Sequence, residues 1–198
     1  MHFRALRVIN EDRIAGGGGF PTHPHRDMEI VTYVVSGAVA HRDSTGGRGV
    51  IKAGELQHMS AGIGVEHSEA NASASEPAHL LQIWILPQRN GLTPTYDQTS
   101  LDRAQKNGAL TLVASMEGGE HLLKINQDVR LFVGKLGVNE KNEHALAAGR
   151  YAWVQLIDGT LELNGQQLQA GDAAAINEES VLRFLAKNDS HFLLFDLG

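Results

Sequence analysis

The sequence predicts an all-β protein in which one structural unit occurs twice. Three observations lead to this prediction. Apolar residues fall in short runs of strand length, glycine-rich turns separate these runs, and few segments show the periodicity of an amphipathic helix. We therefore expect two series of β-strands joined by a more polar connection.

The first series of expected strands lies in the N-terminal part of the chain. Each run is rich in Val, Ile, Leu or Tyr and is bounded by residues such as Gly, Pro, Asn or Ser, which favour turns. These strands are expected at residues 6–10, 29–35, 38–41, 49–52, 57–60 and 79–86.

The second series follows the same rules in the C-terminal part. Its strongest local signal is Asn164-Gly165, because a type I′ hairpin turn requires positive φ at both central residues. The strands are expected at residues 129–136, 151–157, 161–163, 166–168, 173–176, 181–185 and 192–196.

The segment between the two series, residues 88–120, is richer in polar residues and glycine. Within it, residues 97–105 are compatible with one or two helical turns. The expected organisation is an N-terminal domain over residues 1–90, a connecting segment over 91–120 and a C-terminal domain over 121–198.

Two pairs of potential metal ligands have the spacing that a β-strand requires. His23 and His25, and likewise His67 and Glu69, are two positions apart, so both members of a pair point to one face of a strand. Neighbouring strands would thus offer three imidazoles and one carboxylate. This set suits a divalent transition metal with open coordination positions for water, substrate or dioxygen.

The remaining histidines lack a partner at ligand spacing. We interpret His41, His58 and His79 as hairpin, packing or pocket-wall residues. Three further histidines are interpreted as structural: His121, His144 and His191.

The two series resemble diverged copies of one unit. Residues 33–39 and 52–55 match residues 155–161 and 169–172, because in both copies an apolar strand enters a glycine turn and a later turn reads Ala-Gly-acid. A count without gaps from these turns places Ala145, Ala147, Phe184 and Ala186 at the positions of His23, His25, His67 and Glu69. Metal chemistry is therefore expected only in the first copy.

Composition excludes several classes of function. The net charge is −6 and the lysines and arginines are scattered, so no basic surface is available for nucleic-acid phosphates. The absence of cysteine excludes disulfides, a thiolate nucleophile and a cysteine zinc site. No long apolar run or secretory start is apparent. We expect a cytoplasmic protein that binds neither membranes nor nucleic acid.

Residues 17–29 contain the spacing Gly-x5-His-x-His-x3-Glu and, with Gly37, resemble the first cupin motif, and the turn at Gly54 resembles the second. More specifically, residues 19–29, 59–69 and 81–84 are similar to the pirin family of bicupins. The resemblance covers nearly the whole chain. Pirins usually carry further residues before the segment 6–10, so the chain is expected to begin inside the first domain.

This resemblance implies two cupin β-barrels or sandwiches face to face, with a degenerate C-terminal domain that lacks a metal site. It implies that His23, His25, His67 and Glu69 hold one divalent metal. Fe(II) is the first choice, and Mn, Ni, Cu, Co and Zn are compatible. Glu29, a ligand in many other cupins, is expected to have a supporting or structural role.

The resemblance also implies an activity like that of quercetin 2,3-dioxygenase, which cleaves a flavonol or related enol with dioxygen. Glu69 would be the catalytic residue that accepts or shares the proton of the flavonol 3-hydroxyl. The alternative is a metal-dependent regulatory protein that binds a protein partner without turnover. A non-oxidative metal isomerase is a third reading. The protein is expected to be a monomer.

Overall fold

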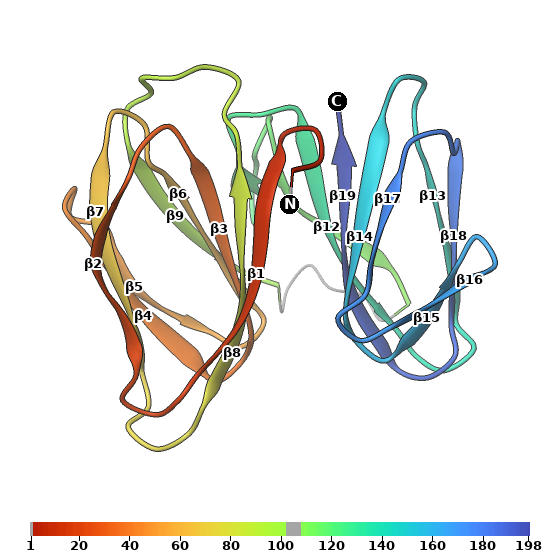
Figure 1. Ribbon diagram of the computed structural model, residues 1–198, viewed down its shortest axis with the longest axis horizontal. Helices are drawn as coiled ribbons and strands as arrows, with labels where there is room; N and C mark the ends of the chain where they lie inside the picture. The colour runs from red at the N-terminus through yellow and green to blue at the C-terminus, as the bar shows by residue number, and fades with distance from the viewer. Residues whose placement is uncertain (1, 102–107) are drawn as a thin grey trace. The chain divides into compact units, whose positions relative to one another are not determined.

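The computed structural model describes residues 2–101 and 108–198. These residues form strands, turns and bends and contain no helix, so the all-β prediction is confirmed (Figure 1). None of the described segments could therefore cross a membrane as a helix. The chain divides into two compact units, one of Met1–Asp102 with Glu117–Gln127 and one of Arg103–Met116 with Asp128–Gly198.

The first unit contains two antiparallel sheets with the strand orders β1-β8-β3-β6-β9 and β2-β7-β4-β5. The larger sheet consists of β1 (Leu6–Ile14), β8 (Ala78–Ile85), β3 (Glu29–Ser36), β6 (Glu55–Ser60) and β9 (Thr95–Ser100). The smaller consists of β2 (Gly19–His25), β7 (Val65–Asn71), β4 (Ala38–Asp43) and β5 (Arg48–Lys52). One apolar cluster packs side chains from both sheets: Ile14, Val34, Val39, Ile51, Ala78 and Leu80.

The second unit repeats this arrangement. In its larger sheet the strands that belong to this unit have the order β10-β12-β19-β14-β17. They are β10 (Leu110–Ser115), β12 (Val129–Leu136), β19 (Ser190–Leu197), β14 (Tyr151–Asp158) and β17 (Ala173–Ile176). Its smaller sheet has the order β13-β18-β15-β16, formed by β13 (Lys141–Ala145), β18 (Val181–Ala186), β15 (Thr160–Leu163) and β16 (Gln166–Gln169). The run β12-β19-β14-β17 corresponds to β1-β8-β3-β6, and the smaller sheets correspond strand for strand. One unit therefore occurs twice, as predicted, and the fold is an all-β bicupin.

Every expected strand coincides with an observed one, with small differences at the ends. The largest extension is in β1, which continues to Ile14 because it stays paired with β8 as far as Ala78. The Asn164-Gly165 hairpin is confirmed, since the two residues have φ of 47° and 82° and Leu163 pairs with Gln166.

The expected connection holds two strands that the sequence did not reveal, β9 and β10. Two strands of the expected C-terminal domain were also missed, β11 (Leu123–Lys124) and β13. The predicted helical turn over residues 97–105 is wrong at residues 97–100, which belong to β9. This strand pairs with β6 from Glu55 to Ser60, so tertiary pairing outweighs its polar sequence. Residues 102–105 of that prediction lie outside the described residues.

Candidate metal centre

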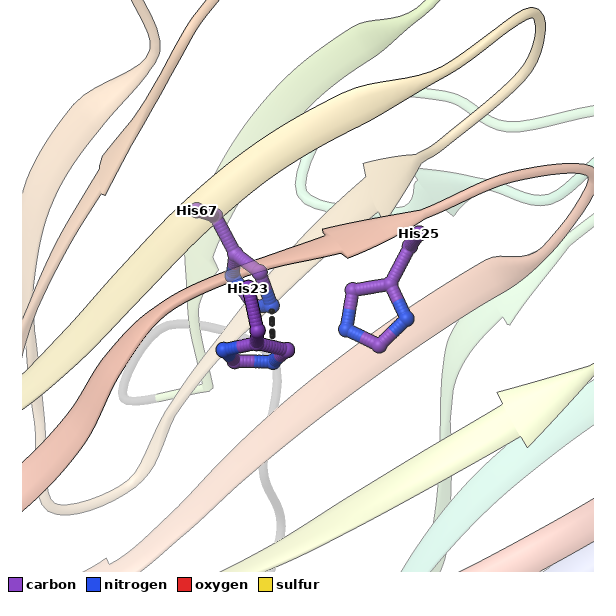
Figure 2. Close-up of side chains that lie close together, drawn as sticks. All are labelled: His23, His25 and His67. Atoms are coloured by element: carbon purple, nitrogen blue, oxygen red, sulfur yellow. Dashed lines mark hydrogen bonds between the residues drawn. The ribbon is translucent and has the colours of Figure 1, made fainter.

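Strands β2 and β7 bring the predicted histidines together. The strands are antiparallel neighbours, and His23 is paired directly with His67. His25 lies two positions beyond His23 and so points to the same face. Figure 2 shows His23 and His25 projecting from one strand and His67 from the adjacent strand, with the three imidazole rings gathered at one point.

The geometry of the three imidazoles fits a metal ion. Ring centroids are 4.4 Å apart for His23 and His67, and 4.8 Å apart for each of these with His25. The Nε2 atoms of His23 and His67 are 3.0 Å apart (Figure 2). Two imidazole nitrogens bound at right angles to one metal, each at about 2.1 Å, would be separated by about 3.0 Å.

The ring of His23 is oriented by its own strand. Its Nδ1–H donates a hydrogen bond to the carbonyl oxygen of Pro21, at 2.8 Å. A neutral imidazole that donates from Nδ1 has a free lone pair on Nε2. His23 therefore presents Nε2 to the centre, as metal-binding histidines commonly do when the other nitrogen is hydrogen-bonded.

Burial keeps two of these imidazoles neutral. Desolvation, with added repulsion from His23, lowers the pKa of His25 to about 4 and that of His67 to about 3. Protons therefore do not compete for these nitrogens near neutral pH, which is a condition for metal binding.

Glu69 lies next to His67 in an overlapping group. Potential ligand atoms of His41, His67 and Glu69 are within 4.8 Å of one another, as are those of His23, His25 and His67. The Glu69 carboxylate is buried, and it accepts hydrogen bonds from Thr32 Oγ1, at 3.3 Å, and from Gln82 Nε2. Burial outweighs these bonds and raises the pKa of Glu69 to about 7.

Several residues around the centre were not assigned a role from the sequence. Trp84 packs edge-on against His25, with ring centroids 4.9 Å apart. Its indole N–H is buried and has no hydrogen-bond partner among the described residues. Thr32 and Gln82 are directly paired on β3 and β8, and both reach Glu69. Only the pairing of the strands reveals these contacts.

Glu29 takes part in a different network. Its carboxylate accepts hydrogen bonds from His58 and Ser60, on β6, and from Asn126. It is fully buried and does not belong to either group of potential metal ligands. His79 also lies elsewhere, 2.7 Å from the Glu11 carboxylate.

Strand register defines the corresponding positions in the second unit. His144 pairs with Leu182 as His23 pairs with His67, and Leu163 pairs with Phe184 as His41 pairs with Glu69. The equivalents of His23, His25, His67 and Glu69 are therefore His144, Leu146, Leu182 and Phe184. Counting without gaps from the glycine turns had given other residues for these four positions. It was wrong because the loops before β14 and β18 differ in length from the corresponding loops of the first unit.

Three of these four positions belong to the apolar core of the second unit. Thr32 and Gln82 are likewise replaced, by Val154 and Leu194, which pair in the same way on β14 and β19. Over residues 108–198 the structure shows no group of three potential metal ligands.

Comparisons with known proteins agree with this arrangement. Residues 1–85 match the family model described as Pirin, and residues 112–197 match that described as Quercetinase C-terminal cupin domain. The chain is 46% identical over 197 residues to quercetin 2,3-dioxygenase of Escherichia coli (strain K12), covering 100% of this chain and 84% of that protein. It is 38% identical over 197 residues to a pirin-like protein of Caulobacter vibrioides, covering 99% and 84%.

Among solved structures, the bacterial pirin YhhW from Escherichia coli in complex with nickel(II) matches with a TM-score of 0.93 and 45% identity, covering 100% of this chain and 84% of that one. Identity at this level extends along the entire sequence and through both cupin units. This chain belongs to the pirin family.

Proposed function

We propose that this protein is a metal-dependent dioxygenase of the pirin type, which cleaves a flavonol or a related enol with dioxygen. The observation that carries the proposal is the convergence of three imidazoles, with the Nε2 atoms of His23 and His67 3.0 Å apart, beside a buried carboxylate. The activity named for the Escherichia coli relative supports the same chemistry.

We propose His23, His25, His67 and Glu69 as the ligands of one divalent metal. Nitrogen and oxygen donors of this kind accept several first-row metals, and Fe(II) is our first choice for the working ion. Nickel(II) in the YhhW structure supports a divalent metal in this family.

When bound, the metal would supply Lewis acidity that makes the enolate of the substrate accessible near neutral pH. The three histidines hold geometry. Glu69 takes the proton of the substrate hydroxyl, because a carboxylate beside the metal is within reach of a hydroxyl bound there. Thr32 and Gln82 fix the orientation of its two oxygens.

A surface hollow adjoins the proposed centre at His25 and is also lined by Pro24, Ile63 and Glu66. The Ile63 side chain is exposed there.

The test is oxygen uptake with quercetin, using protein loaded anaerobically with Fe(II). His23→Ala is the site variant, and His144→Ala is its control, because His144 occupies the same register position in the second unit. We expect uptake, with equal release of carbon monoxide, from the wild type and His144→Ala only.

Absence of uptake from wild-type protein shown to hold iron would overturn the dioxygenase proposal. Uptake without carbon monoxide would also overturn it, because simple autoxidation of the flavonol consumes oxygen without ring cleavage.

A further inference from the structure

His67 is the innermost end of a chain of contacts that leads away from the metal centre. Its Nδ1 lies 3.4 Å from Nδ1 of His41, and His41 Nε2 lies 3.2 Å from Asp43 Oδ2. All three side chains come from adjacent strands, because Asp43 on β4 is paired with His67 on β7. The side chains of His41 and Asp43 are 0% and 1% exposed.

Asp43 is anchored so that only one of its oxygens faces His41. Its Oδ1 accepts hydrogen bonds from the Thr45 amide at 2.8 Å, the Thr45 hydroxyl at 2.7 Å and the Gly47 amide at 3.0 Å. The other oxygen is left for the imidazole. An ionised carboxylate only accepts, so His41 must carry its proton on Nε2 and donate it to Asp43.

This direction of donation passes to His67. A neutral His41 with its proton on Nε2 has an acceptor at Nδ1, and the group facing that acceptor is Nδ1 of His67. His67 must then carry its proton on Nδ1, which leaves Nε2 bare at the point where it faces His23. The opposite tautomer would direct an N–H into the centre and could not bind a metal there.

We propose that Asp43 and His41 are positioning residues that fix the tautomer of His67 and so prepare its Nε2 for metal. The inference rests on the metal site proposed above and adds two residues to it. Neither needs to touch the metal or the substrate.

The surroundings of His41 are built closely around this contact. The Tyr96 ring, from β9, lies over the imidazole with centroids 5.0 Å apart and planes inclined by 33°. A Cβ on Gly47 would overlap Asp43 Oδ2 and approach Tyr96 Cβ to 2.9 Å, and one on Gly49 would lie 2.5 Å from the Tyr96 hydroxyl. Glycine at these positions leaves the room that the chain of contacts occupies.

The second unit provides an internal comparison. By register, Leu163 stands in place of His41 and Leu182 in place of His67. Where the ligand is absent, the residue that would orient it is absent too. A histidine kept only to fill space would not require this joint replacement.

The decisive variant is Asp43→Asn, which keeps the shape and reverses the direction of donation. Its amide oxygen must still face the three donors of Thr45 and Gly47, so its NH2 group points at His41. His41 must then accept at Nε2 and donate from Nδ1, which forces the proton of His67 onto Nε2. The matched control is Glu11→Gln, which removes the carboxylate of the separate Glu11–His79 pair on the larger sheet of the same unit.

Two readouts apply to the chain as a whole. Long-range proton–nitrogen NMR of metal-free protein reports the tautomer of His67, and anaerobic titration reports affinity for Ni(II), used as the probe. We expect Nδ1–H in the wild type and Glu11→Gln, Nε2–H in Asp43→Asn, and a loss of Ni(II) affinity of about 10- to 100-fold in Asp43→Asn alone.

A second pair of variants serves if Asp43→Asn does not fold. His41→Gln can still accept from His67 and donate to Asp43, whereas His41→Leu copies the second unit and can do neither. We expect His41→Gln to bind Ni(II) more tightly than His41→Leu, and equal affinities would overturn the proposal.

An unchanged His67 tautomer in Asp43→Asn would also overturn it, as would unchanged Ni(II) affinity. Because the tautomer is measured without metal, substrate or oxygen, this result does not depend on the outcome of the oxygen-uptake experiment. The expected changes in both readouts for Asp43→Asn, together with no dioxygenase activity in the wild type, would reject the proposed function and support the positioning role.

Discussion

Replacing Glu29 tests how much one buried carboxylate contributes to the first unit. Its Oε1 accepts from Ser60 Oγ at 2.6 Å, and its Oε2 accepts from His58 Nε2 at 2.9 Å and from the amide and side chain of Asn126 at 2.9 and 3.1 Å. Asn126 belongs to the segment Glu117–Gln127, so the carboxylate ties this segment to β3 and β6.

The expected loss follows from these contacts. In Glu29→Gln the amide oxygen can keep the three donors at Oε2, and the Ser60 hydroxyl can turn to accept from the new NH2 group. What remains is the difference between charged and neutral hydrogen bonds, about 1 kcal/mol for each of the three, so unfolding should become easier by up to about 3 kcal/mol. Glu29→Ala leaves the buried donors of His58 and Ser60 without an acceptor, at about 1–3 kcal/mol each, and should be more damaging.

The pH dependence has a definite sign. Burial alone would raise the pKa of Glu29, but the hydrogen bonds from His58, Asn126 and Ser60 outweigh it and hold the pKa below 4.5. A carboxyl group whose pKa is depressed by folding stabilises the protein above pH 4.5, and this contribution is lost as the pH falls through the folded-state pKa. The gap between wild type and Glu29→Gln should therefore narrow in acid.

The assay is urea unfolding in a Trp153→Phe background, where Trp84 is the only tryptophan and reports on the first unit. A Glu29→Gln variant as stable as its parent at pH 7, or a stability gap that does not change below pH 4.5, would refute the reasoning.

Three further predictions concern the second unit and the metal. Asp196→Asn should weaken the second unit at neutral pH, because Asp196 is buried and bonded to His144 and Arg150, and this loss should vanish in acid. The reason is that these bonds outweigh burial and hold the pKa of Asp196 below 3.8. Trp153 fluorescence in a Trp84→Phe background would measure unfolding of the second unit. A loss of stability that does not depend on pH would contradict this prediction. Phe184→Ala should lower the free energy of unfolding by about 3–5 kcal/mol, since its ring stacks on that of Phe192 in the core, with ring centroids 4.9 Å apart. Metal analysis should nevertheless show the same metal content per chain as in the wild type. In chelator-treated wild type, Ni(II) at 100 times its Kd should raise the free energy of unfolding by about 2.7 kcal/mol, which a higher melting temperature would show. In His25→Ala, Ni(II) should leave the melting temperature unchanged.

The fold was largely predictable because its signals are local. Short apolar runs and glycine turns define most strands, and the same turn pattern at Gly37 and Gly159 reveals the repeat. Strand β9 was missed because its sequence is polar and only its pairing with β6 makes it a strand. Because loop lengths differ between the two units, counting along the sequence gave the wrong equivalent residues, whereas the pairing of strands identifies them.

The candidate site was predictable to the same extent. The pairs His23/His25 and His67/Glu69 have a spacing that needs only the geometry of a strand. His41 and Asp43 have the same spacing, which was overlooked because their role depends on β4 lying beside β7 and on the Tyr96 ring covering His41. Such contacts are set by tertiary packing and leave no local pattern.

Leucines and a phenylalanine stand in the second unit at positions where the first unit has the proposed ligands, and this difference has a consequence for stability. The metal-free first unit buries a carboxylate and imidazoles at positions where its sister buries hydrocarbon, and it gives up the corresponding hydrophobic stabilisation. Binding of the proposed metal would offset this loss in the first unit alone. In a cell, proteases would remove metal-free chains more readily, and the amount of protein would follow the supply of metal.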